Sequence, residues 1–394
     1  MSNSATKTDR EVKLAILLSR VPLDTPMIDE ARRLAEQGVE WKEVANFATR
    51  LLIEPAVFGN LRTFFSEEID PELLKDFTRR DYFARATALT QTVRVLESYR
   101  SMTAAGIDAL VLKGPATSVT GYDNPSLRYF SDIDLVIKRV DLAAAQAHLE
   151  SRGYKPLFDS QSRESLITGQ HALEFEGSGP PVELHWALLP RHLKFDLTPE
   201  ALWNEAVTIE SSGTEFKALA AHHLFLYLCA HGAKHAWNSY RWVCDVAQLA
   251  RRLTAAEAEK VIALAERTHT KRIVALALRI VRETFGEEPS PFSRDAFGED
   301  RQVKSLVLMA RAGFDPSLEG HPILPRRLAR LHPYAEPLTF WIRSRERLRD
   351  RVTAAARFVF EPAPGDRPKG AANMVLRPAR MVRNALRSAV RPRD

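Results

Sequence analysis

The sequence predicts an α+β protein in which a short mixed sheet with flanking helices is embedded between helical N-terminal and C-terminal regions. Apolar residues recur at helical spacing through most of the first hundred residues and again from about residue 218 to residue 285. The segments between these regions alternate or run apolar over five to seven residues, as strands do. A chain of 394 residues, 45% of them hydrophobic, is long enough for more than one such unit.

The N-terminal region is predicted as several short helices followed by a long one. Residues such as Leu14 and Val44 belong to apolar stripes of helical spacing, and prolines and glycines separate the stripes. The long helix is expected to run from about residue 71 to residue 105, because Gly106 suits the position just past a helix end. We assign residues 1–80 to an N-terminal helical region.

The predicted sheet is built from four short segments. They are residues 107–113, 132–138, 171–176 and 182–186, of which the last two are expected as a hairpin or as adjacent strands. After the first strand, the chain is expected to turn at Gly114 and Pro115 and to continue as a short helix. An amphipathic helix is expected over residues 141–152. The core that contains the sheet is therefore placed at residues 81–210, and a C-terminal helical region at residues 211–320.

The positive charge of the chain is concentrated at its C-terminal end. Residues 321–394 hold 17 basic residues, 16 of them arginine, against six acidic ones, whereas the remainder holds 39 basic and 44 acidic residues. The basic pI therefore belongs to this Arg-rich helical tail and does not indicate that the whole protein binds nucleic acid. The tail would suit an anionic membrane surface, an RNA or an acidic partner, and the alternative is a solvated or disordered basic extension.

The sequence also predicts a compartment. Cys229 and Cys244 both lie in apolar helical patterns, which favours buried, reduced thiols. The first ten residues do not resemble a signal peptide, and the longest apolar run, residues 224–230, is too short to span a membrane. We therefore expect a cytoplasmic protein.

The most informative tripeptide is Asp132-Ile133-Asp134. On a strand, residues two apart face the same side, so both carboxylates would project together while Ile133 enters the core. At about 4 Å such carboxylates repel by roughly 4 kcal/mol at an effective dielectric of 20. A fold keeps such a pair by protonating one acid or by placing a cation between them. Alone, however, the motif is weak evidence for a metal site, because many strand edges carry paired acids.

Two further segments strengthen the interpretation. Lys113 and Gly114 end the preceding strand, where a glycine lets the backbone approach phosphates closely. Glu183 and His185 share one face of another strand. If that strand lies beside the one that carries Asp134, Glu183 completes a three-carboxylate cluster, and hard oxygen ligands of this kind suit Mg²⁺.

These motifs, in their order, carry a family resemblance. Lys113-Gly114 is followed by Arg128, by Ser131-Asp132-Ile-Asp134, by a helix ending at Gly153-Tyr154, and by Glu183-Leu-His185-Trp186. In this the chain resembles a bacterial nucleotidyltransferase family of the DNA polymerase β superfamily. The resemblance covers roughly residues 30–250.

The resemblance implies a minimal nucleotidyltransferase fold and two-metal transfer of an NMP from an NTP, with ATP the expected donor, to a hydroxyl-bearing acceptor and release of pyrophosphate. The acceptor would be a small molecule, a protein side chain or a nucleic-acid end. It implies Mg²⁺, for which Mn²⁺ can substitute, and the metal-binding and catalytic carboxylates Asp132, Asp134 and Glu183. The implied nucleotide-binding residues are Lys113, Gly114, Arg128, Ser131 and His185. The superfamily's usual glycine-serine turn is Lys113-Gly114 here, so Lys113 and Arg128 are expected to hold the phosphates.

Several alternatives stay open at this stage. Arg128 is either a phosphate clamp or a loop arginine that is solvated or partnered by Asp132, and His185 is either catalytic or an orienting or half-exposed residue. His231 and His235 either bind a transition metal or form a packed face with Trp237 and Asp245 over the site. For the whole protein, the alternative to an enzyme is a catalytically silent nucleotide- or RNA-binding module that uses the same pocket and the basic tail.

Overall fold

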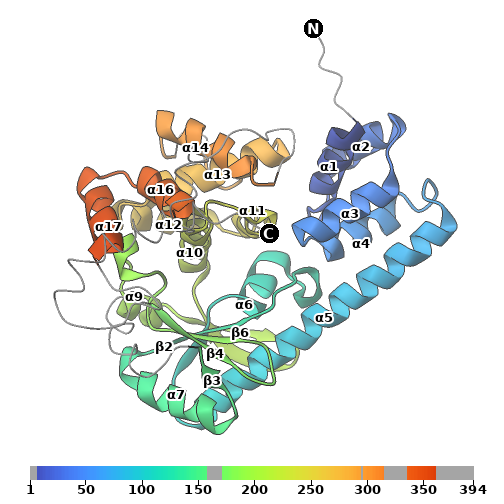
Figure 1. Ribbon diagram of the computed structural model, residues 1–394. Helices are drawn as coiled ribbons and strands as arrows, with labels where there is room; N and C mark the ends of the chain where they lie inside the picture. The colour runs from blue at the N-terminus through green and yellow to red at the C-terminus, as the bar shows by residue number, and fades with distance from the viewer. Residues whose placement is uncertain (1–6, 158–170, 294–295, 315–334, 361–394) are drawn as a thin grey trace, which may run out of the picture.

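The fold combines one mixed sheet with a larger body of helices (Figure 1). The structure is a computed structural model that describes residues 7–157, 171–293, 296–314 and 335–360. Within these residues it contains fifteen α-helices and a seven-stranded sheet, which confirms the predicted α+β class. No helix in the described residues is both long enough and apolar enough to cross a lipid bilayer.

The sheet has the strand order β3-β4-β5-β2-β1-β7-β6. The central pairs β2–β5 and β1–β7 are parallel, and the other neighbours are antiparallel. The strands are β1 (Ala109–Val111), β2 (Ile133–Ile137), β3 (Lys155–Pro156), β4 (Ala172–Glu176), β5 (Val182–His185), β6 (Val207–Ser211) and β7 (Thr214–Ala218). The strands expected at 107–113, 132–138, 171–176 and 182–186 are thus present, each with shorter bounds.

The helices of the N-terminal half are α1 (Lys7–Leu18), α2 (Thr25–Glu36), α3 (Trp41–Leu51), α4 (Glu54–Phe64), α5 (Pro71–Ala104), α6 (Pro115–Thr117) and α7 (Leu142–Ser151). Those that follow are α9 (Pro199–Asn204), α10 (Ala221–Lys234), α11 (Tyr240–Ala250), α12 (Ala255–Arg267), α13 (Lys271–Phe285), α14 (Arg301–Arg311), α16 (Ala335–Ser344) and α17 (Leu348–Phe360). Local sequence explains the long helix α5: Asp70 caps the amides of Glu72 and Leu73, and Pro71 occupies the first turn. Gly106, with φ of +76°, follows its end as expected.

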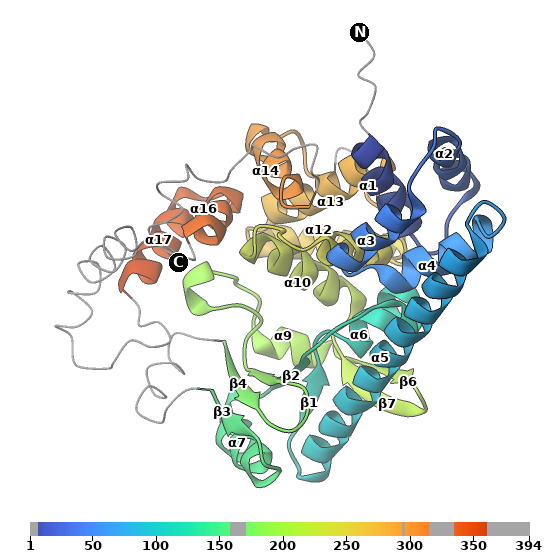
Figure 2. The same cartoon turned by 45° about the vertical axis from the view of Figure 1, so that its right-hand side comes forward.

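Two hydrophobic cores follow from the alternation of the strands. Ala109, Val111 and Leu135 face α5 and α7 and form the sheet core, whereas Leu110 and Val136 face the other way and join the helical core. The helical core also unites the N-terminal helices with α10, α11, α13 and α16. Figure 2 shows α5 extending from the N-terminal helices along the sheet, against which it packs. Asp134 has the parity of Val136, so it lies on the face directed at the helical core.

The structure redraws the predicted domain boundaries. The hairpin β6–β7 was not expected from the sequence, and it spans the position of the predicted boundary at residue 210. It belongs to the sheet because β7 pairs with β1 through Val111 and Ala218. Helix α5 likewise crosses the predicted boundary at residue 80, and α1 packs on α13. The two helical regions therefore share one core and are not separate units.

The predicted Arg-rich tail is also corrected in part. Its segment 335–360 forms α16 and α17, and α16 packs against α10. Trp341 is fully buried and donates a hydrogen bond from Nε1 to the carbonyl of Leu193 at 3.0 Å. Arginines alternate along the sequence from Arg343 to Arg351, and one of them, Arg345, is fully buried as well, with Nη2 3.5 Å from Asp350 Oδ2. Residues 361–394 lie outside the described residues; their segment 373–390 has the sequence pattern of a basic amphipathic helix.

Candidate active site

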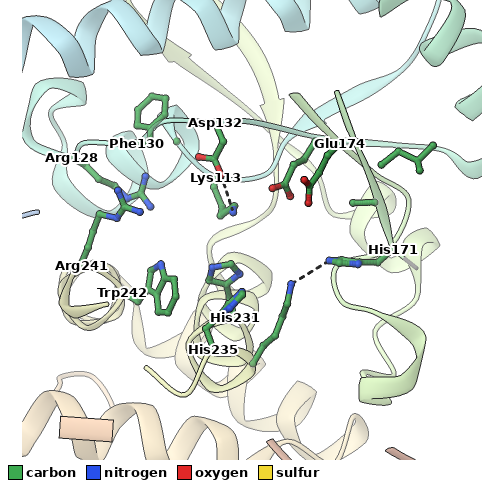
Figure 3. A pocket seen from close by; sticks show the side chains of 15 residues that line it. Lys113, Arg128, Phe130, Asp132, His171, Glu174, His231, His235, Arg241 and Trp242 are labelled. Atoms are coloured by element: carbon green, nitrogen blue, oxygen red, sulfur yellow. Dashed lines mark hydrogen bonds and ion pairs between the residues drawn. The ribbon is translucent and has the colours of Figure 1, made fainter. Parts of the chain in front are cut away.

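A cavity of about 330 Å³ lies between the sheet and the helices α10 and α11 (Figure 3). One wall, which we call the sheet wall, carries Lys113, Asp132 and Glu183. The opposite wall, which we call the helical wall, is formed by residues of α10 and α11, which are His231, Lys234, His235, Arg241 and Trp242. The cavity therefore brings Lys113, at the end of β1, together with helical residues more than a hundred positions later in the chain.

The Lys113-Gly114 turn closes the end of β1. Gly114 has φ of +58°, and a Cβ atom there would lie 3.0 Å from the ring of Phe130, so a side chain is excluded twice over. Lys113 Nζ lies 3.1 Å from Asp134 Oδ1 and 3.9 Å from Asp132 Oδ2. Lys113 is thus the cation between the two aspartates, and both carboxylates face the same ammonium group, as the strand period predicts.

Asp132 and Asp134 have opposite electrostatic environments. Burial raises the pKa of Asp132, and the neighbouring Asp134 carboxylate raises it further. Burial also acts to raise the pKa of Asp134, but Lys113 and His185 outweigh it and hold that pKa well below its usual range. Burial likewise acts to lower the pKa of Lys113, and the attraction of Asp134 reverses this, so the pKa is raised. At neutral pH Lys113 and Asp134 therefore form a buried ion pair.

A row of carboxylates crosses three neighbouring strands. Asp134 of β2 is in register with Glu183 of β5, which is in register with Glu174 of β4. The strand at 182–186 therefore lies beside that at 132–138, as the three-carboxylate cluster requires. Glu174 was not among the predicted site residues, although the alternation Leu173-Glu174-Phe175 places it on the face opposite the core side chains.

His185 lies beneath this row of carboxylates. Its Nε2 atom is 3.0 Å from Asp134 Oδ1 and 3.1 Å from Glu183 Oε2, and the side chain is 2% exposed. Burial acts to lower the pKa of His185, but the hydrogen bonds to both carboxylates outweigh it and raise the pKa. His185 is therefore buried and orients two carboxylates, and it is not among the residues that line the cavity.

The donor set fits a hard divalent metal ion. One ligand atom each from Asp134, Glu183 and His185 lies within 4.8 Å of the others. Asp132 and Glu183 line the cavity, whereas Asp134 is 2% exposed and does not. Carboxylate oxygens are the ligands that Mg²⁺ prefers, and the open side of Asp132 and Glu183 leaves room for substrate phosphates.

Arg128 connects the two walls. Its Nε and Nη2 atoms donate to the two carboxylate oxygens of Asp245, on α11, at 2.7 and 2.9 Å, and Tyr122 donates to the same carboxylate at 3.1 Å. Burial acts to lower the pKa of Arg128, and Asp245 outweighs it, so the pKa is raised. Arg128 is therefore neither a solvated loop arginine nor the partner of Asp132. Its Nη1 atom is buried and has no hydrogen-bond partner among the described residues, and Arg128 lines the cavity.

The helical wall is built by helical spacing. His231, Lys234 and His235 are three and four residues apart at the end of α10, so they share one face. The rings of His231 and His235 lie 5.0 and 5.1 Å from that of Trp242 on α11. Burial lowers the pKa of both imidazoles, to about 3 for His235, so both are neutral at pH 7. Of the expected face, His231 and His235 line the cavity and pack on Trp242, whereas Trp237 and Asp245 are buried and are not among the residues that line it.

One predicted residue lies apart from the others. Ser131 is exposed and is not among the residues that line the cavity, so the structure does not bring it to the nucleotide-binding residues. Sequence reasoning also did not single out His171, Lys234, Arg241 and Trp242, which line the cavity. Their signal was present: His171 begins a predicted strand, and the other three lie among the residues between His231 and Asp245.

Comparison with known proteins bears on what this arrangement is. Residues 37–286 match a protein family described as an uncharacterised nucleotidyltransferase. The chain belongs to this family. The match confirms the resemblance drawn from the motifs, and it covers the sheet, the helical wall and all but the first two helices of the N-terminal region. None of the curated proteins matches the chain. The general reaction of this nucleotidyltransferase is therefore nucleotidyl transfer, and its family membership implies an NTP substrate.

Proposed function

We propose that this nucleotidyltransferase moves an NMP from an NTP, with ATP as the expected donor, to a hydroxyl group of an acceptor, with release of pyrophosphate. The observation that carries the proposal is the row of register-matched carboxylates Asp134, Glu183 and Glu174. Glu183, Glu174 and the nearby Asp132 line a cavity that also holds cationic groups, and Asp134 lies buried behind them. Paired acids at a cavity wall, opposite groups that bind phosphate, are what a metal-dependent phosphoryl transfer needs.

Asp132, Asp134 and Glu183 would hold Mg²⁺, with Mn²⁺ as a substitute. When bound, divalent ions at such carboxylates stabilise the charge of the reacting phosphate and lower the pKa of an attacking hydroxyl. Lys113 neutralises Asp134 at 3.1 Å, and with Mg²⁺ bound to that carboxylate the ammonium would be available to a phosphate oxygen. In the absence of ligand, the Lys113 ammonium thus balances the negative charge of the buried Asp134 carboxylate.

Arg128 and Arg241 would bind the triphosphate. Arg128 keeps Nη1 free of any hydrogen-bond partner, and Arg241 donates from Nη1 to the carbonyl of Tyr129 at 3.0 Å, which fixes its position beside Arg128. In Figure 3 both guanidinium groups lie on the same side of the cavity as Phe130, the ring that packs on Gly114. Arginine suits this role because its planar donors match phosphate oxygens. Phosphoryl transfer is mostly such positioning and charge neutralisation.

The experiment uses the full chain with NTPs labelled on the α-phosphate, candidate acceptors, and either Mg²⁺ or Mn²⁺. We expect pyrophosphate release that requires the metal and that falls by about a thousandfold in Asp132→Asn, because lost metal binding removes several kcal/mol of transition-state stabilisation. Asp108→Asn is the matched control, since Asp108 is exposed and lies outside the cavity. Metal-independent ATP binding that survives Asp132→Asn, without turnover of any NTP, would instead indicate a silent binding module.

A further inference from the structure

The cations of the cavity fall into two groups by their partners. Lys113 and Arg128 each form an ion pair with a buried aspartate, Asp134 and Asp245 respectively. In the part of the chain that the structure describes, Lys234 and Arg241 form no ion pair. Lys234 Nζ instead lies 3.5 Å from His171 Nε2, and Arg241 Nε has no hydrogen-bond partner.

The two cations without carboxylate partners lie at opposite ends of the cavity. Figure 3 places Arg241 beside Arg128 at one end and His171, the hydrogen-bond partner of Lys234, at the other. The carboxylates Asp132, Glu183 and Glu174 line the same cavity, and Figure 3 shows Glu174 on the side of His171. A transferase has two substrates, and the reacting groups of both must meet at the carboxylates, so the two ends can each take one substrate.

The charges at the two ends of the cavity indicate which substrate each end binds. A triphosphate carries several negative charges, and it matches the end with two guanidinium groups next to the Lys113-Gly114 turn. The other end offers one ammonium and one imidazole, which suit a single carboxylate or phosphate group. Burial, with a contribution from Lys113, lowers the pKa of Lys234 to about 8, and a bound anion would reverse this cost of holding an ammonium away from water.

We propose that Lys234 and His171 bind an anionic group, a carboxylate or a phosphate, on the acceptor that receives the nucleotide. The inference rests on the proposed function and names the substrate class of the second half of the site. With its anionic group at this end, the acceptor would direct its hydroxyl towards Glu183 and Asp132, where the NTP arrives from the other end.

The test separates the two ends by titration of the full chain in a calorimeter. A methylene analogue of ATP, which cannot be cleaved between the α- and β-phosphates, is first bound with Mg²⁺ to saturation. Inorganic phosphate and succinate are then titrated separately as probes. We expect the wild type to bind one probe molecule beside the analogue, and the stronger of the two probes identifies the acidic group as phosphate or carboxylate.

Substitutions of Lys234 and Arg241 test which ligand binds at each end of the cavity. Lys234→Gln should weaken probe binding at least about tenfold and leave the affinity for the analogue within about twofold, whereas Arg241→Gln should do the reverse. Lys234→Arg should restore most of the probe affinity. Lys217→Gln, at an exposed strand position, is the matched control and should change neither. Melting temperatures check the fold of each variant, and Lys234→Gln is expected to melt no lower than the wild type because it removes a buried charge.

The outcomes are distinct. Equal probe affinity in the wild type and in Lys234→Gln, or a loss of analogue affinity in Lys234→Gln as large as in Arg241→Gln, overturns the assignment of Lys234 to the acceptor. If the wild type does not bind the analogue at all, the proposed function fails. If the probes then still bind in a way that depends on Lys234, Lys234 forms an anion site, but that site does not bind the acceptor of a nucleotidyl transfer.

Discussion

The two walls of the cavity differ in how their charged groups are compensated. On the sheet wall, Lys113, Asp134, Glu183 and His185 contact one another at 3.0 to 3.1 Å, and strand register fixes their positions. On the helical wall, the rings of His231, His235 and Trp242 pack on one another. Lys234 contacts His171, and no described carboxylate pairs with Lys234. Folding alone compensates the buried charges of the sheet wall, whereas Lys234 of the helical wall has no described counterion, which the anion that we propose would supply.

The largest expected effect concerns Arg128–Asp245, the ion pair that joins the walls. Asp245→Asn leaves a buried guanidinium without its counterion and should reduce the free energy of unfolding by about 3–5 kcal/mol. Urea denaturation followed by circular dichroism measures this. The double variant Arg128→Met with Asp245→Leu, which removes both charges, should recover most of the loss. A loss below about 1 kcal/mol in Asp245→Asn would mean that the walls fold independently of this pair.

The second prediction concerns the support of the helical wall. Trp341 of α16 is fully buried, and α16 packs on α10, which carries His231 and Lys234. Trp341→Ala should therefore cost about 3–5 kcal/mol of unfolding free energy. Leu348→Ala is the control, because Leu348 is 72% exposed and its loss should change stability by less than about 0.5 kcal/mol. Similar unfolding curves for the two variants would mean that residues 335–360 do not stabilise the helical core and form a peripheral tail.

The third prediction contrasts the two aspartates of the sheet wall. Asp134→Asn should lower the free energy of unfolding by about 2–3 kcal/mol, because Lys113 loses its buried counterion. Asp132→Asn should leave stability unchanged or higher, since Asp132 is repelled by Asp134. Sequence reasoning, which sees only two carboxylates that repel each other, predicts that either substitution leaves the stability unchanged or slightly higher. Chemical denaturation of both variants at pH 7 measures these changes. Equal changes in the free energy of unfolding would contradict the proposed difference between Asp132 and Asp134.

The last prediction is a pH dependence of stability that arises from Lys234 on the helical wall. The folded chain releases the Lys234 proton near a pKa of about 8, whereas the unfolded chain keeps it up to about 10.5. The unfolded state therefore binds more protons between these values, so this lysine makes stability rise with pH, by at most about 1.4 kcal/mol per pH unit. In Lys234→Met the rise between pH 8 and pH 10 should be smaller. If the free energy of unfolding changes with pH equally in the wild type and in Lys234→Met, burial does not lower the pKa of Lys234.

Much of the sheet wall was predictable because strands have a period of two. The spacing of Asp132, Asp134 and Glu183 predicted which side chains share a face, and the structure places the latter two in register. The ammonium of Lys113 between the aspartates is one of the two solutions that electrostatics allows for a close carboxylate pair.

The helical wall was less predictable, because its function depends on which helices meet. The partner of Arg128 is Asp245, and no local pattern pairs residues so far apart in the sequence. The hairpin β6–β7 was missed for a related reason: Val207, Thr208 and Glu210 are exposed or half-exposed, so the segment has little hydrophobic signal. The tail was misjudged because arginines usually indicate a solvated surface, whereas Arg345 is buried against Trp341 and Asp350.

The ion pair of Arg128 with Asp245 also sets an order of events during synthesis, because its members are 117 residues apart. A ribosome that adds about 5–20 residues per second needs roughly 6–23 seconds to reach Asp245 after Arg128. During that interval Arg128 has no carboxylate from α11, β1 lacks the strand β7 until Ala218 is made, and the cavity has only one wall. We therefore expect nucleotide to be bound only by chains synthesised beyond α11, so that unfinished chains do not capture NTP.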